Sequence, residues 1–92
     1  MRTYRVLLSE TAVRQLRDLP DADREGIKRA LAQLADDPFR PRPGVDIKRL
    51  RGPGREYHRL RVGDHRAIYV VEGDRVLVAK VVRRSKAYKW LD

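Results

Sequence analysis

The chain has 92 residues, a net charge of +9 and no cysteine, so we expect one small domain over residues 1–92, without disulfides or thiolate metal sites. Its two histidines are too few for a zinc site without several carboxylates beside them, and we expect neither a metal nor a small-molecule cofactor. No apolar run approaches the ~20 residues that a membrane helix requires, and the first residues lack the apolar core of a secretion signal. These features predict a cytoplasmic protein that does not bind a membrane.

The first half of the chain predicts a strand and two helices. Residues 3–8 have the pattern of a strand, and Ser9 is suited to cap a helix over residues 10–19. Asp21 is expected to cap a second helix that ends before Pro38, because the residue before a proline disfavours the helical conformation. We expect the two helices to form an antiparallel hairpin.

The second half of the chain predicts a sheet. Its apolar residues recur with a period of two, and the pattern is broken at glycines. The Gly-Asp pairs at 63–64 and 73–74 suit two-residue turns with glycine at the first central position. The expected strands are 46–51, 55–62, 65–72 and 75–83. The order strand, helix, helix and four strands predicts an α+β fold, with the helices packed on one face of a mainly antiparallel sheet.

The positive charge is concentrated in this second half. Residues 1–46 hold nine Lys and Arg against eight Asp and Glu, whereas residues 47–92 hold thirteen against five. Of the 22 basic residues 17 are arginine, whose planar guanidinium binds phosphate oxygens in pairs. This distribution is typical of a domain that binds a polyanion, although basic residues that only solvate a small fold would give the same composition.

The turn at 63–64 determines which side chains share a face of the sheet. It sets Arg61 opposite Arg66 and Arg59 opposite Ile68, so the three arginines lie on one face. The same alternation, continued through the next turn, adds Arg83 to that face. It brings Leu77, Ala79 and Val81 there as well, and turns Val76, Val78, Lys80, Val82 and Arg84 away. The opposite face, expected to be covered by the helices, carries His58, Leu60, Val62, Ala67, Tyr69 and Val71.

Like charges on adjacent strands are unfavourable, and this raises the question of what offsets their repulsion here. An anionic ligand such as a phosphate would do so, because a guanidinium donates paired hydrogen bonds to phosphate oxygens. A solvated strand face without a ligand is the alternative interpretation.

Three segments resemble the RelE/ParE superfamily of toxins of type II toxin–antitoxin systems: YRVLLSETAVRQLRDLP near the start, IKRLRGPGREYHRLRVGDHRAIYVV in the centre and VVRRSKAYKW near the end. The central segment is the most specific, because it combines the turn with the spacing of the arginines. The resemblance implies a RelE-like toxin fold and a cognate antitoxin as a partner. For the RelE branch it also implies a metal-independent, ribosome-dependent endoribonuclease whose other partners are the ribosome and mRNA.

The resemblance also implies roles for individual residues. The family's catalytic positions fall on Arg59, Arg61, Arg66, Arg84 and Tyr88, and Tyr57, Arg83, Lys86 and Lys89 are expected to contact RNA. Strand alternation favours Arg83 on the active face, whereas spacing back from Tyr88 favours Arg84. The general base stays open between Lys86, His65 and none, the last meaning dependence on positioning within the ribosome. His65 stands where the family's signature usually has tyrosine.

Two other functions remain open at this point. ParE-like relatives share the fold and inhibit DNA gyrase instead of cutting RNA, but they usually lack the complete basic set. The second alternative is a degraded toxin that retains only antitoxin or RNA binding. The departure at His65 and the undetermined base favour this alternative.

Overall fold

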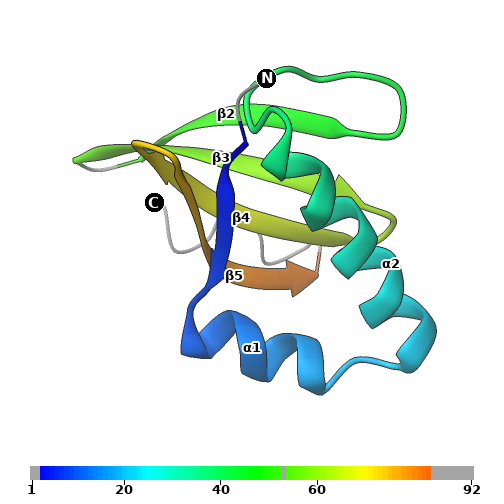
Figure 1. Ribbon diagram of the computed structural model, residues 1–92. Helices are drawn as coiled ribbons and strands as arrows, with labels where there is room; N and C mark the ends of the chain where they lie inside the picture. The colour runs from blue at the N-terminus through cyan, green and yellow to red at the C-terminus, as the bar shows by residue number, and fades with distance from the viewer. Residues whose placement is uncertain (1–2, 53, 84–92) are drawn as a thin grey trace.

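The structure of the chain, a computed structural model, describes residues 3–52 and 54–83. Its elements are β1 (Arg5–Leu8), α1 (Glu10–Arg17), α2 (Asp21–Ala32), the short 3-10 helix η1 (Gln33–Ala35), β2 (Asp46–Gly52), β3 (Arg55–Val62), β4 (His65–Glu72) and β5 (Arg75–Arg83) (Figure 1). This order confirms the predicted α+β arrangement. None of the helices described is long and apolar enough to cross a membrane.

The five strands form one mixed sheet in the order β1-β5-β4-β3-β2. Strands β2 to β5 form an antiparallel meander, and β1 joins the edge by pairing in parallel with β5. The predicted turns are confirmed, because Gly63 and Gly73 have φ angles of 58° and 61°. A side chain rarely adopts such angles, and glycine does so at no steric cost.

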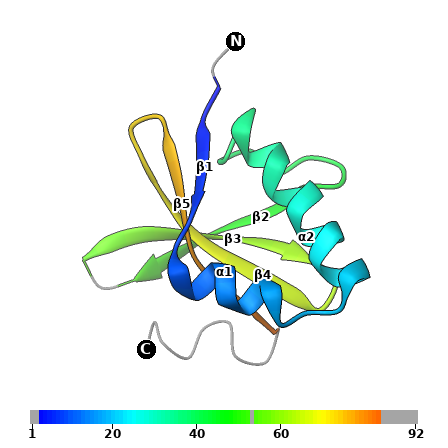
Figure 2. The same ribbon diagram turned by 60° about the horizontal axis from the view of Figure 1, so that its bottom comes forward.

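Both helices cover one face of this sheet. α1 contacts β5 and α2 contacts β3, while the two helices lie at a wide angle to each other (Figures 1 and 2). They are therefore not the antiparallel pair expected from the sequence. The expected cap of the second helix is also wrong: Pro20 holds the N-cap position, and the Asp21 carboxylate pairs with Arg24 within the first turn.

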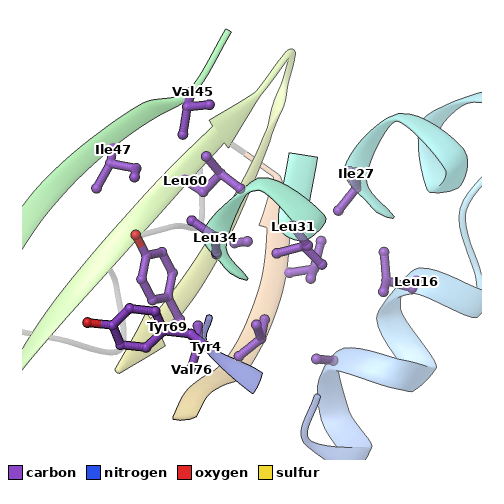
Figure 3. Packing of buried hydrophobic residues seen from close by; sticks show 14 residues of the cluster. Tyr4, Leu16, Ile27, Leu31, Leu34, Val45, Ile47, Leu60, Tyr69 and Val76 are labelled. Atoms are coloured by element: carbon purple, nitrogen blue, oxygen red, sulfur yellow. The ribbon is translucent and has the colours of Figure 1, made fainter. Parts of the chain in front are cut away.

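The core lies between the helices and the sheet, on the face predicted to be apolar. Figure 3 shows side chains from both layers in contact, with Leu16, Ile27, Leu31 and Leu34 from the helical layer and Leu60, Tyr69 and Val76 from the strands. Tyr69 is completely buried, and its hydroxyl donates a hydrogen bond of 2.7 Å to the carbonyl of Pro38. The connector after the helices is thereby attached to the centre of the sheet.

A β-bulge in β5 changes which of its side chains face the core. Tyr69 pairs with Val78, but the preceding residue Ile68 pairs with Lys80, so Ala79 is an extra residue. Beyond the bulge Val81 lies in the core, at 4% exposure. The prediction that Ala79, Val81 and Arg83 continue the arginine face is therefore wrong. Lys80 and Val82 take that face instead, because one inserted residue reverses the alternation.

The bulge is attached to the start of α1 through Ser9. The Ser9 hydroxyl accepts a hydrogen bond from the amide of Ala12 at 3.0 Å, which confirms the predicted cap. The same hydroxyl donates to the carbonyl of Ala79 at 2.7 Å, and the Ser9 amide donates to the carbonyl of Val78 at 2.9 Å. One residue thus joins the helix start to the irregular part of the sheet.

Candidate nucleic-acid interface

Arg59, Arg61 and Arg66, called the arginine cluster below, lie on the helix-free face, the sheet face that neither α1 nor α2 covers. Arg61 is directly opposite Arg66 in the β3–β4 register, and Arg59 is opposite Ile68, as predicted from the turn. Ile68 is completely buried although it does not belong to the main core. The cluster therefore stands on a firmly packed strand pair.

Arg59 is held by an acidic neighbour on β2. Its Nη1 donates to Oδ1 of Asp46 at 2.9 Å and to the Asp46 carbonyl oxygen at 3.1 Å. The side chain of Arg59 is only 14% exposed, whereas that of Asp46 is 54% exposed. Asp46 is also opposite Arg61 in the β2–β3 register, which places its carboxylate beside two members of the cluster. This carboxylate offsets part of the repulsion between the arginines.

Arg66 and Arg61 differ in their surroundings. Arg66 is 6% exposed, and its Nη1 donates to the carbonyl oxygens of Gly63 and His65, each at 3.1 Å, so its guanidinium closes the hairpin turn. Arg61 is exposed and makes no hydrogen bond or ion pair within residues 3–52 and 54–83. Two of the three arginines thus have internal partners, and the cluster is stable without a bound phosphate. Arg61 is the member best placed to bind one.

Two lysines and a tyrosine extend this surface. Lys48 lies opposite Arg59 and Lys80 lies opposite Ile68, on the same face as the cluster. Tyr57, predicted to contact RNA, lines a pocket on this face together with Val70. Sequence reasoning missed Lys80 because the alternation was continued through the bulge. It missed Lys48 and Asp46 because the register of β2 against β3 was not worked out, although the turn at 52–54 provided the signal.

Arg83 and His65 lie on the other side of the sheet. They are paired in the register between β4 and β5, and together they line a pocket with Asp23 and Gly26 of α2. The prediction that Arg83 faces the cluster is therefore wrong, and the bulge at Ala79 is the reason. His65 as a general base in the cluster is contradicted by the same placement. The predicted site residues Arg84, Lys86, Tyr88 and Lys89 lie outside the described residues.

The second histidine belongs to the packed interior. His58 is 5% exposed and stacks on Tyr69 with a ring separation of 5.3 Å, while Phe39 contacts it edge-on at 5.5 Å. Burial lowers the pKa of His58, and the Glu56 carboxylate only partly opposes this effect. Burial also raises the pKa of Tyr69. Within the part of the chain that the structure describes, no group of three His, Cys, Asp or Glu side chains could hold a metal ion.

Comparisons with known proteins agree with this geometry. Residues 6–88 match the family described as ParE toxin of type II toxin-antitoxin system, parDE. The chain is 29% identical over 86 residues to Toxin RelE3 of Methanocaldococcus jannaschii, which covers 94% of this chain and 97% of that protein.

Two solved structures are similar over nearly the whole chain. A chain of the archaeal RelE-RelB complex from Pyrococcus horikoshii OT3 is 32% identical with a TM-score of 0.77, over 92% of this chain and 99% of that one. A chain of the toxin-antitoxin complex RelBE2 from Mycobacterium tuberculosis is 26% identical with a TM-score of 0.74, over 89% and 99%. The present chain therefore belongs to the RelE/ParE superfamily of toxins of type II toxin–antitoxin systems.

Proposed function

We propose that this toxin is a ribosome-dependent endoribonuclease that cleaves mRNA and thereby inhibits translation. The observation that supports this most directly is the arginine cluster on the helix-free face of β3 and β4, next to Lys48 and Lys80. Guanidinium groups arranged in this way suit a phosphodiester, whose non-bridging oxygens accept hydrogen bonds from them.

The proposed reaction uses the nucleophile that RNA already carries. The 2′-oxygen attacks the adjacent phosphorus, the bond from phosphorus to the 5′-oxygen breaks, and the products are a 2′,3′-cyclic phosphate and a 5′-hydroxyl. Arg59 and Arg66 hold the phosphate, and Arg61 stabilises the charge that develops on its oxygens. Arg84 would stabilise or protonate the leaving oxygen, and Tyr88 would stack on a base.

The removal of the 2′-hydroxyl proton determines how much the protein contributes to the reaction. Both histidines of the chain lie on the helix-covered side, and an arginine stays protonated under ordinary conditions. Lys86 is the remaining candidate base among the predicted residues. The arrangement otherwise favours catalysis by alignment of the RNA and stabilisation of charge, with the ribosome holding the substrate.

A cognate antitoxin is the proposed protein partner. Similar chains occur in toxin-antitoxin complexes with RelB from Pyrococcus horikoshii and Methanococcus jannaschii. The net charge of +9 favours a partner with an acidic segment, because such a segment neutralises the basic face that RNA would otherwise occupy.

Inducible expression with mapping of mRNA 5′ ends tests the cleavage. Wild-type toxin should produce new 5′ ends in phase with codons, and Arg61→Ala should reduce them by about 100-fold, as expected for loss of one donor to the developing charge. Arg14→Ala on α1 removes the same charge from a different surface and should cleave as the wild type does. Arg61 is preferred to Arg66 because Arg66 also holds the turn. Intact mRNA after wild-type expression refutes the proposed activity.

Inhibition of DNA gyrase is the second candidate, because the matching family is described as a parDE toxin. The same experiment separates the two functions. Accumulating DNA breaks with intact mRNA would support gyrase as the target.

A further inference from the structure

A pocket of about 370 Å³ lies beside the arginine cluster on the helix-free face. Its lining comes from four strands: Leu7 of β1, Leu77 of β5, Val70 of β4 and Tyr57 of β3, with Arg55 and Lys80 at its edges. This size falls within the range of about 300–1,000 Å³ that is usual for ligand sites, which are mostly apolar with a few polar groups. Leu7 is 37% exposed, which is an unfavourable exposure for a large apolar side chain.

The pocket and the cluster occupy successive rows of one surface. Val70 lies two residues from Ile68 along β4, a separation of about 7 Å. Ile68 pairs with Arg59 on one side and with Lys80 on the other. A chain bound along β4 with one phosphate at the cluster would therefore bring its neighbouring unit over the pocket.

We propose that this pocket receives the base of the RNA nucleotide next to the phosphate held by the arginine cluster. The inference rests on the proposed function and extends it to a base-binding subsite. Single-stranded RNA is recognised by bases that leave the stack and contact aromatic and apolar side chains, because every base has an apolar face. Tyr57 and Leu77 provide such surfaces, and Lys80 places a cation where the strand's phosphates pass.

The pocket wall is fixed before any ligand binds. Ala79 and Val78 belong to this wall, and Ser9 holds both of their carbonyl oxygens at the bulge. At the opposite edge Nη2 of Arg55 donates to Oε2 of Glu72 at 3.1 Å. A preformed wall reduces the entropy lost on binding, which suits a small rigid ring.

Binding measurements with a non-cleavable RNA test the subsite. The probe is a fluorescent, 2′-O-methylated RNA pentamer, measured at low salt against the full chain, with each base removed in turn. For wild-type protein, one abasic position should weaken binding about tenfold. Leu77→Trp fills the pocket and should abolish that loss, while Val13→Trp on α1, which substitutes another partly exposed apolar residue, should retain it. Arg61→Ala should weaken all pentamers equally.

Several results would overturn the proposal. It fails when no abasic position weakens binding to the wild type, or when the loss persists in Leu77→Trp. A Leu77→Trp protein that keeps the loss but no longer binds the antitoxin shows a protein-docking site instead. Unfolding in urea confirms that the variant folds, and Leu77→Ala, which removes the side-chain contact with the base, should also diminish the loss. Because the probe cannot be cut, a base-dependent toxin that leaves cellular mRNA intact would refute the nuclease and not the pocket.

Discussion

Asp46 accepts two hydrogen bonds from Nη1 of Arg59, one to its carboxylate at 2.9 Å and one to its carbonyl oxygen at 3.1 Å. The acid stands on β2 and the arginine on β3, so the contact joins an edge strand to the arginine cluster. The cluster would be more strongly basic without this carboxylate. Its presence indicates that the orientation of Arg59 matters more than maximal positive charge.

Replacement of Asp46 separates these two effects. Asp46→Ala removes the side-chain acceptor, and we expect RNA cleavage to fall about tenfold, equivalent to about 1.4 kcal/mol in the barrier. Asp46→Asn keeps an oxygen that can accept from Arg59 and removes the negative charge, so it should retain most of the cleavage and bind RNA more tightly. Cleavage rates and RNA affinity are measured on both variants. Equal cleavage by the alanine variant and the wild type would contradict the positioning role.

Tyr69→Phe tests the attachment of the connector to the sheet. Burial raises the pKa of Tyr69, so its hydroxyl stays protonated and donates to the Pro38 carbonyl. Without it that buried carbonyl loses its partner, and the free energy of unfolding should fall by about 1–3 kcal/mol. Tyr57→Phe, on the less buried helix-free face, should have a smaller effect. Urea unfolding of the two variants decides, and similar losses would count against the buried bond.

His58 should make stability depend on pH. Its folded-state pKa lies below the ordinary value of 6.5, mainly because of burial, so the unfolded chain binds the proton more readily. The free energy of unfolding is therefore highest above pH 6.5. It decreases as the pH falls from there towards the folded-state pKa, by about 1.4 kcal/mol for each unit of pKa depression.

His58→Phe preserves an aromatic ring between Tyr69 and Phe39 and should remove this slope. His65→Asn removes the other histidine and should leave the slope as in the wild type. Denaturation at pH 7.5 and pH 5.5 compares them. A slope that follows His65 instead of His58 would refute the assignment.

Ser9→Ala should weaken both the start of α1 and the bulge. The variant loses the cap on the Ala12 amide and the bond to the Ala79 carbonyl, and we expect about 1–2 kcal/mol less stability. Ser9→Thr retains a hydroxyl and should recover most of this loss. Hydrogen exchange at Val81, whose amide donates to Gln15 of α1 at 2.6 Å, should become faster in the alanine variant only.

Local rules predicted most of the fold. The cap at Ser9, the glycine-first turns and the alternation in β3 and β4 depend on neighbouring residues, so a single sequence contains their signals. The angle between the helices was not predictable in this way, because it depends on which strands they contact. α1 rests on β5 and α2 on β3, and these strands are distant in the sequence from the helices.

The candidate site was predicted as far as the bulge. Arg59, Arg61 and Arg66 share a face because a two-residue turn determines their register. Arg83 was misplaced because the extra residue at Ala79 has no clear signal in a run of small apolar residues. Asp46 was missed because its importance comes from a contact with another strand.

The parallel pair of β1 and β5 has a consequence for the time at which this protein becomes native. Arg5 pairs with Arg75 and Leu8 with Val78, so the first strand meets its partner only after most of the chain has been synthesised. Contacts that close such a long loop form slowly and late. A toxin of this topology cannot complete its sheet while its own C-terminal strand is still being made, so each copy becomes active only after its own synthesis is nearly finished.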